Sequence, residues 1–181
     1  MLTEEEKTVA PQAGEKTPEP LRVCFVCTGN TCRSPMAAAV ANDLADRTRR
    51  ALPESVRGCA VLPLEAVSAG LFANEGEPIS RNAVLALEEA GVLPTPEHDF
   101  HNHTAKNLTH ELAEVCNLIV AVSPRHAQQL LLTMPDQLSK IKVLPDAISD
   151  PYGGDLSVYR KCLEEITRGV RALLFPEEPH A

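Results

Sequence analysis

Apolar positions along the chain fall into two patterns: short uninterrupted runs, and longer stretches in which apolar residues recur every three or four positions. The uninterrupted runs predict buried strands, whereas the spaced positions predict amphipathic helices. The predicted strands are 22–27, 66–68, 115–122 and 141–144. The predicted helices are about 35–50, 80–90, 124–132 and 158–174. Because strands and helices alternate, we expect a single α/β domain with a parallel sheet covered by helices on both faces.

Three segments fall outside this pattern. Residues 1–20 contain five Glu, three Pro and no apolar periodicity, so they predict a disordered acidic and proline-rich tail. Residues 51–65 contain two prolines and one glycine without a clear period, and predict a connection. The folded domain is therefore expected over 21–176, with a flexible C-terminus at 177–181.

Charge and composition exclude several classes of partner. The 17 Lys and Arg are outnumbered by 25 Asp and Glu, which leaves no basic field for nucleic acid or an anionic membrane surface. The chain shows no apolar run like that of a signal peptide, and no stretch of about 18 apolar residues for a membrane span. These features predict a cytoplasmic protein. Six cysteines are too few for a disulfide-built scaffold.

The first predicted strand meets the first predicted helix at a short loop with the sequence CTGNTCRS. Ser34 followed by Pro35 is a helix-start signal, because serine caps free amides and proline suits the first helical turn. Five residues between Cys27 and Arg33 can wrap backbone amides around a tetrahedral oxyanion, and the helix adds its positive N-terminal end. Gly29 permits the unusual backbone angles that such a turn needs.

The residue types in this loop favour phosphoryl transfer. Arg33 offers a planar fork of charged donors that can clamp two phosphoryl oxygens. Cys27, beside inward amides and a guanidinium, is favoured as a thiolate nucleophile, and Ser34 can donate its hydroxyl to the sulfur. The loop lacks the second glycine and the lysine of the nucleotide-binding GxxxxGKS/T motif, which disfavours a nucleotide triphosphatase.

The same residues also have simpler interpretations. An isolated cysteine that ends an apolar strand is usually part of a core, and an isolated arginine that opens a helix is usually solvated. The joint spacing, loop and strand-to-helix context favour the catalytic interpretation. Cys24 and Cys27 also form one CxxC pair, which occurs in metal-binding and redox motifs, although Cys24 lies within the predicted strand.

The motif CTGNTCRSP, followed far downstream by Asp150-Pro151-Tyr152, resembles the low-molecular-weight protein tyrosine phosphatase family over roughly residues 22–174. The resemblance implies a four-stranded parallel sheet flanked by helices, a phosphocysteine intermediate, and no metal or other cofactor. It also implies that Asp150 protonates the leaving group and then activates water. Without the family, Asp150 and Pro151 are simply a turn before a helix.

The resemblance assigns further roles around the loop. It implies that these residues bind the phosphoryl group or substrate: Thr28, Gly29, Asn30, Thr31, Cys32, Ser34 and Tyr152. Asn30, Ser68 and His103 match polar residues that brace the loop and orient Ser34, although each alone is typical of ordinary capping. Cys32 matches family members in which this position forms a reversible disulfide with Cys27 and shields it from further oxidation.

The match of His103 is loose, because neighbouring histidines crowd the same segment: His98, His101 and His110. The sequence His101-Asn102-His103 is also compatible with a metal site. Carboxylate or cysteine residues at supporting spacing are missing, so we predict no metal there.

The predicted partner is a phosphorylated protein. Thr31 stands where tyrosine-directed members commonly carry a larger aliphatic residue, and the loop resembles that of bacterial protein arginine phosphatases, as does DPYGG at 150–154. Gly153 departs from the second aromatic residue of many tyrosine-directed members. Tyr152 can stack on a phosphotyrosine ring or line a guanidinium, so it is compatible with a phosphotyrosine and with a phosphoarginine substrate. We expect protein phosphoarginine as the substrate, with protein phosphotyrosine as the alternative.

Two further functions remain as alternatives. An arsenate reductase of the same fold also uses a cysteine and an arginine in this loop, but it needs a closely spaced cysteine pair to relay a disulfide. The remaining cysteines, Cys59, Cys116 and Cys162, are too scattered for that pair. A non-catalytic phosphate-binding or redox-sensing module needs no general acid, so the presence of Asp150 disfavours it. The oligomeric state is not indicated.

Overall fold

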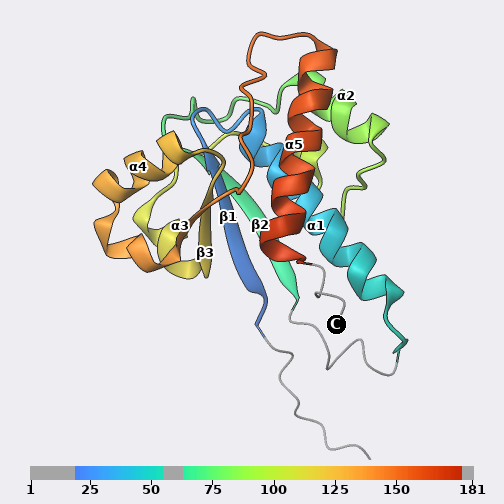
Figure 1. Cartoon of the computed structure of the whole chain (residues 1–181), viewed down its shortest axis with the longest axis horizontal. Helices are drawn as coiled ribbons and strands as arrows, with labels where there is room; N and C mark the ends of the chain where they lie inside the picture. The colour runs from blue at the N-terminus through green and yellow to red at the C-terminus, as the bar shows by residue number, and fades with distance from the viewer. Residues whose placement is uncertain (1–18, 55–62, 177–181) are drawn as a thin grey trace, which may run out of the picture.

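The computed structural model describes residues 19–54 and 63–176 (Figure 1). The segment predicted as a flexible C-terminus at 177–181, nearly all of the tail predicted for 1–20 and the middle of the connection predicted for 51–65 lie outside the described residues. Within the described ranges, the helices are too short or too polar to cross a membrane.

A parallel sheet of four strands forms the centre of the described fold, in the order β2-β1-β3-β4. The strands are β1 (Leu21–Cys27), β2 (Leu64–Gly70), β3 (Leu118–Ala121) and β4 (Ile141–Val143). The predicted parallel sheet is confirmed. β2 is longer than the predicted strand because it pairs with β1 along its whole length, up to Gly70 beside Cys27. β3 is shorter than predicted because Val115 ends a helix.

Helices lie against both faces of this sheet, as predicted (Figure 1). The α-helices in the described part of the chain are α1 (Arg33–Ala51), α2 (Arg81–Glu89), α3 (His110–Val115), α4 (Pro124–Thr133) and α5 (Leu156–Leu174). Among the described residues, the 3₁₀ helix η2 (Phe100–Asn102) lies between α2 and α3, and the 3₁₀ helix η3 (Pro135–Lys140) lies between α4 and β4. The short helices α3, η2 and η3 were not predicted, because segments of three to six residues carry too little periodicity.

Alternate residues of β1 contribute to two separate cores. Val23, Phe25 and Cys27 belong to the core that α1, α2 and α5 cover, whereas Cys24 and Val26 belong to the core under α3 and α4. Successive side chains of a strand point to opposite faces, so residues three positions apart also lie on opposite faces. Cys24 and Cys27 therefore do not form a metal-binding or redox pair.

α1 begins at Arg33, two residues before its predicted start, with Cys32 at the N-cap position and no side-chain cap. The prediction that Ser34 caps this helix is therefore wrong. Ser34 already lies inside the first turn, where it is fully buried, and its hydroxyl lies 3.0 Å from the Cys27 sulfur. The start of α1 thus presents the positive end of the helix to the loop.

α1 packs against the sheet through a face of small and medium side chains, which include Ala37, Val40 and Ala41. Asn42 follows on the same helix and contacts β2, an edge strand of the sheet. Its side-chain nitrogen donates to the Ala66 carbonyl at 2.9 Å, and its side-chain oxygen accepts from the Ala66 amide at 2.9 Å. A side chain thus pairs both backbone groups of one edge residue, which protects the edge from other strands.

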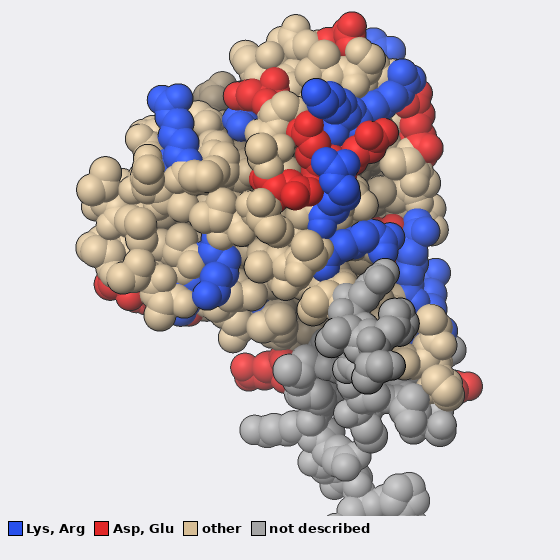
Figure 2. Space-filling model, viewed as in Figure 1, with Lys and Arg blue, Asp and Glu red and all other residues tan. Residues whose placement is uncertain are grey.

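Charged side chains of both signs lie side by side over α5 and its neighbours (Figure 2). Arg160 on α5 donates to both carboxylate oxygens of Glu89 at the end of α2, with nitrogen–oxygen distances of 2.7 and 2.9 Å. Exposed ion pairs contribute little to stability, so the buried contacts hold α5 in place. The position of α5 matters because the loop before it carries Asp150.

Candidate active site

The CTGNTCRS loop lies at the carboxyl end of β1, the edge of a parallel sheet where ligands of open α/β folds bind. The segment after β2 supports it: the Leu71 amide donates to the Cys27 carbonyl at 2.9 Å and the Phe72 amide donates to the Thr28 carbonyl at 2.9 Å. A Cβ on Gly70 would lie 2.7 Å from the Thr28 carbonyl oxygen, so only glycine permits this close approach.

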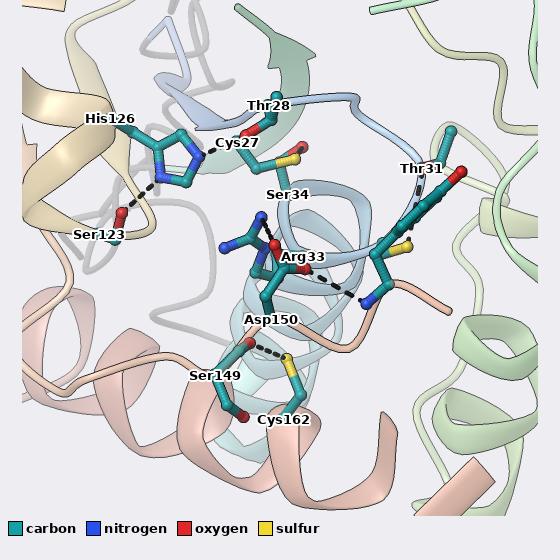
Figure 3. Close-up of polar contacts among 12 residues, drawn as sticks. Cys27, Thr28, Thr31, Arg33, Ser34, Ser123, His126, Ser149, Asp150 and Cys162 are labelled. Carbon is teal, nitrogen blue, oxygen red and sulfur yellow. Dashed lines mark hydrogen bonds and ion pairs between the residues drawn. The ribbon is translucent and has the colours of Figure 1, made fainter. Parts of the chain in front are cut away.

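The Cys27 sulfur has two polar contacts inside the loop. The Asn30 amide donates to it at 3.3 Å. The Ser34 hydroxyl lies 3.0 Å away, and Figure 3 shows Cys27 and Ser34 next to each other. Cys27 itself is 3% exposed. An amide and a hydroxyl directed at a sulfur stabilise negative charge on it, as the predicted nucleophile requires.

Asn30 adopts the left-handed backbone conformation in this loop, with φ of 56°. The prediction assigned the unusual angles to Gly29, and that assignment is wrong, because positive φ in the loop falls on Asn30. Asparagine tolerates this region better than other non-glycine residues. The fully buried Asn30 side chain donates to Ser34 and Ser68 hydroxyls, each at 2.9 Å, and accepts from the Lys106 amide at 3.0 Å. Its amide therefore ties the strained residue to the surrounding fold.

His103 contacts the same strained residue. Its Nε2 lies 2.8 Å from the Asn30 carbonyl oxygen, and because a carbonyl only accepts, Nε2 carries the hydrogen. Burial lowers the pKa of His103, which favours the neutral form with that hydrogen on Nε2. The structure thus brings His103 and Ser68 to the loop. In contrast, His101 is exposed and lies against Asp99 and Glu88.

The histidine-rich segment does not assemble a metal site. Among the residues that the structure describes, no three His, Cys, Asp or Glu side chains are grouped in a way that could hold a metal ion. His101 and His103 have different partners, because one contacts the solvent-facing acids and the other contacts the loop.

Arg33 and Asp150 meet at the same site although they are 117 positions apart. Arg33 Nη2 donates to Asp150 Oδ2 at 2.9 Å, and the two side chains are 10% and 57% exposed. The Tyr152 amide donates to the other Asp150 oxygen at 3.2 Å. The Tyr152 side chain is 76% exposed. Figure 3 shows the guanidinium and the carboxyl group next to each other, with Arg33 at the start of α1 and Asp150 in the loop before α5.

The loop that carries Asp150 is anchored on α5 by residues that the sequence did not single out. The amide and the hydroxyl of Ser149 both donate to Glu165 Oε2 at 2.7 Å. Although burial acts in the opposite direction, these hydrogen bonds hold the pKa of Glu165 below its usual value. The Cys162 sulfur donates to the Ser149 carbonyl at 3.3 Å, and burial raises the pKa of this thiol to about 12. Cys162 is thus a neutral structural contact.

Cys32 is a free thiol with a polar environment of its own. Its sulfur lies 3.1 Å from the Ser80 hydroxyl and 3.2 Å from the Tyr159 hydroxyl, which comes from α5. Burial, followed by the contact with Cys32, raises the pKa of Tyr159 to about 12. Thr31 is 6% exposed, and its carbonyl accepts from the Ser80 amide at 2.8 Å. These contacts attach the second half of the loop to α2 and α5.

His126, near the start of α4, is the second contribution that sequence reasoning missed. Its Nε2 lies 2.9 Å from the Thr28 hydroxyl and its Nδ1 lies 2.6 Å from the Ser123 hydroxyl. The sequence does carry one signal for His126. The runs that form β1 and β3 both predict parallel strands, and residues that follow parallel strands lie together at one edge of the sheet. Only the strand order shows that β3 lies directly beside β1.

Comparisons with known proteins agree with this geometry. Residues 22–178 match the family model described as low molecular weight phosphotyrosine protein phosphatase. The protein-arginine-phosphatase of Bacillus subtilis is 32% identical over 158 residues, which cover 83% of this chain and 93% of the relative. A low molecular weight protein tyrosine phosphatase from T. tengcongensis superposes with a TM-score of 0.71 at 34% identity, over 85% of this chain and 97% of that one.

A third relative bears on the chemistry. A YwlE arginine phosphatase mutant whose active-site serine is phosphorylated superposes with a TM-score of 0.69 at 28% identity, over 84% of this chain and 92% of that one. A phosphorylated side chain at the nucleophile position is consistent with a phosphocysteine in the unsubstituted enzyme. Sequence, fold and site geometry agree that the chain belongs to the low molecular weight phosphotyrosine protein phosphatase family.

Proposed function

We propose that this chain is a cytoplasmic protein phosphatase whose preferred substrate is protein phosphoarginine. The observation that carries the proposal is the convergence of three groups at the end of β1: Cys27 with donors on its sulfur, Arg33 at the start of α1, and Asp150 2.9 Å from that guanidinium. A nucleophile, an oxyanion clamp and a proton donor are the groups that phosphoryl transfer through a covalent intermediate requires.

In the proposed first step, the Cys27 thiolate attacks phosphorus. A sulfur–phosphorus bond forms as the phosphorus–nitrogen bond breaks, and Asp150 gives its proton to the departing nitrogen. Arg33 and the amides of residues 28–33 hold the phosphoryl oxygens. Asp150 is 57% exposed and reaches Arg33 through one oxygen, so a phosphoryl group that engages Arg33 leaves the carboxyl group available to the leaving group.

In the proposed second step, Asp150 acts as a carboxylate and removes a proton from water. The water oxygen attacks phosphorus, and the sulfur of Cys27 leaves as a thiolate, which restores the enzyme. The arginine product, which forms in the first step, is a guanidinium cation. Asp150 has just given its proton to the departing nitrogen and is negative at that moment. It can therefore pair with the product before release, an interaction that a neutral tyrosine product does not offer.

The relatives and the loop wall support the choice of substrate. The Bacillus subtilis protein-arginine-phosphatase shares 32% of aligned residues with this chain. Thr31 carries a small side chain in the loop, 6% exposed and with its hydroxyl 3.7 Å from the Cys32 sulfur. In this proposal, Thr31 forms the wall beside the bound phosphoryl group. A small wall residue leaves room for the planar phosphoguanidinium group. A larger aliphatic residue there narrows the space in favour of an aromatic ring.

Two peptides that differ only in phosphoarginine or phosphotyrosine test this proposal. We expect the wild-type chain, under reducing conditions and without added metal, to show the higher kcat/KM for phosphoarginine. Thr31→Ile should shift the ratio toward phosphotyrosine, whereas Thr31→Ser, which stays small, should keep it. Cys27→Ser should abolish turnover of both. A wild-type preference for phosphotyrosine that Thr31→Ile does not change would overturn the choice of substrate, and no turnover at all would favour a non-catalytic module.

Protein phosphotyrosine is the second candidate, and the exposed aromatic residues near the loop favour it. Tyr152 is 76% exposed beside Asp150, and Phe72, whose amide supports Thr28, is 67% exposed. Either ring can stack against an aromatic substrate. The arsenate reductase alternative is weaker, because Cys116 and Cys162 belong to cores on opposite faces of the sheet and do not form a relay pair.

We also propose that Cys27 and Cys32 form a reversible disulfide that protects the nucleophile. Hydrogen peroxide would accept the two electrons, the two thiols would lose their hydrogens as water forms, and a sulfur–sulfur bond would result. The Cys32 sulfur would leave its contacts with Ser80 and Tyr159. Peroxide should therefore inactivate the wild type in a way that dithiothreitol reverses. In Cys32→Ser, dithiothreitol should restore little activity; full recovery in that variant would exclude the disulfide.

A further inference from the structure

His126 bridges two hydroxyls at the edge of the candidate active site. The imidazole lies between Ser123 and Thr28, with contacts of 2.6 Å at Nδ1 and 2.9 Å at Nε2 (Figure 3). The residue is 5% exposed, although Thr28 and the neighbouring Arg125 are exposed. The ring is therefore enclosed by protein and fixed at both of its nitrogens.

Thr28 connects His126 to the phosphate-binding loop that carries the reacting groups. It directly follows Cys27 and opens the phosphate-binding loop, which runs from residue 28 to the start of α1. Its carbonyl accepts from the Phe72 amide at 2.9 Å on one side, and its hydroxyl contacts His126 on the other. With these two contacts, the direction in which the loop leaves β1 is set by α4 and by the segment after β2.

Ser123 provides a second and independent observation. It occupies the N-cap position of α4 with extended backbone angles, where a serine normally accepts a hydrogen bond from an amide of the first turn. Its hydroxyl makes no such cap and lies instead against His126 Nδ1. The helix forgoes its side-chain cap, and the hydroxyl orients the imidazole.

The protonation state of the His126 ring determines how donors and acceptors are divided between these two hydrogen bonds. Burial, and then the positive charge of Arg33, lowers the pKa of His126 to about 4; Arg125 acts in the same direction and Asp150 opposes it. A neutral imidazole has one donor nitrogen and one acceptor nitrogen. One of the two hydroxyls therefore donates to the ring and the other accepts from it, in a single ordered chain from Ser123 to Thr28.

We propose that His126 is a positioning residue for the phosphate-binding loop, acting through the Thr28 hydroxyl to hold the first turn of the loop in the geometry that receives a phosphoryl group. The inference rests on the proposed function, because it assigns His126 to the same site. Without the contact, the first loop residue keeps only the Phe72 hydrogen bond, and the loop amides and the Cys27 sulfur lose their fixed relation to each other. Small displacements of reacting groups lower rates strongly.

Two substitutions of His126 separate positioning from packing. Glutamine places its terminal nitrogen or oxygen as many bonds from the backbone as Nε2, so His126→Gln can keep the contact with Thr28. Asparagine reaches only as far as Nδ1, so His126→Asn can keep Ser123 but loses Thr28. We expect His126→Gln to retain kcat/KM for the preferred phosphopeptide within a few-fold of wild type and His126→Asn to lose on the order of 10-fold. His110→Gln, on an exposed histidine of α3, is the matched control and should be unchanged.

A double-mutant cycle that combines His126→Asn with Thr28→Val completes the test. Because Thr28 is exposed, its replacement should affect the folding of the chain little. Thr28→Val and His126→Asn should each lower kcat/KM on the order of 10-fold, and the double variant should lose little more than either single variant. Weaker inhibition by inorganic phosphate should accompany each loss. Additive effects in the cycle, or His126→Gln as damaging as His126→Asn, would overturn the inference while leaving the proposed function intact. Absence of activity in the wild type would instead refute the proposed function.

Discussion

At the scale of single residues, the chemistry of the site depends on where a few hydrogens go. The Ser34 hydroxyl has one hydrogen and two acceptors in reach, the Cys27 sulfur at 3.0 Å and the Ala69 carbonyl at 3.2 Å. A Cys27 thiol can donate to Ser34 while Ser34 donates to Ala69. When the sulfur is negative, the same hydrogen can turn to it. The hydroxyl thereby serves both states of Cys27 without movement of heavy atoms.

His126 should make the stability of the fold depend on pH. Its pKa is about 4 in the folded chain, against an ordinary value of 6.5. As pH falls through this window, the unfolded chain takes up a proton that the folded chain does not, so the unfolding free energy decreases. This contribution is complete above pH 6.5 and lost as pH approaches 4. Glutamine does not titrate, so His126→Gln should reduce the slope of the unfolding free energy against pH.

Urea denaturation of the wild type and His126→Gln at several pH values between 4 and 6.5 measures this difference. His103 also has a lowered pKa, but it remains in both proteins and therefore cancels in the comparison. Identical slopes for the two proteins would show that the His126 imidazole does not titrate differently in the folded and unfolded chains.

At the scale of secondary-structure elements, α5 holds the loop of the proposed general acid. Glu165 accepts two hydrogen bonds of 2.7 Å from Ser149, the residue before Asp150, and Asp155 caps the start of α5 through the amides of Ser157 and Val158. Pro151 is buried. The carboxyl group of Asp150 thus projects from a loop whose two ends are attached to the same helix.

Removal of the Glu165 anchor should lower kcat more than it changes KM. Glu165→Ala frees the Ser149 amide and hydroxyl, so Asp150 samples positions from which it cannot protonate the leaving group; we expect a loss on the order of 10-fold in kcat. Glu164→Ala, at an exposed neighbouring position, is the matched control. Steady-state kinetics with an activated aryl phosphate, which needs less proton donation, should show a smaller loss. An equal loss with both substrates would contradict a role through Asp150.

At the scale of the whole molecule, the site is assembled where separate segments meet at one edge of the sheet. The loop after β1 contacts the segment after β2 through Leu71 and Phe72, the start of α4 through His126, and the acid loop through Asp150. The order β2-β1-β3-β4 makes this possible, because β1 has a neighbour on each side and the carboxyl ends of all these strands lie together.

The sequence by itself determined the parts of this protein that depend on local relations. The alternation of apolar runs and helical spacing determined the class of fold. The short spacing along the sequence between Cys27 and Arg33, in the loop that follows the first predicted strand, determined the chemistry that this loop can perform. Helix starts were less accurate, because Ser34 and Pro35 carry a start signal that the buried contact of Ser34 with Cys27 overrides.

Only the tertiary structure decided which distant residues complete the site. His126 and Thr28 are 98 positions apart, and Cys32 and Tyr159 are 127 positions apart. No periodicity or spacing along the chain encodes such contacts, because they follow from the order of the strands and from how the helices pack on them. The same reason explains why the left-handed residue is Asn30: its buried amide has partners from β2 and from the segment around Lys106, which only the folded chain brings together.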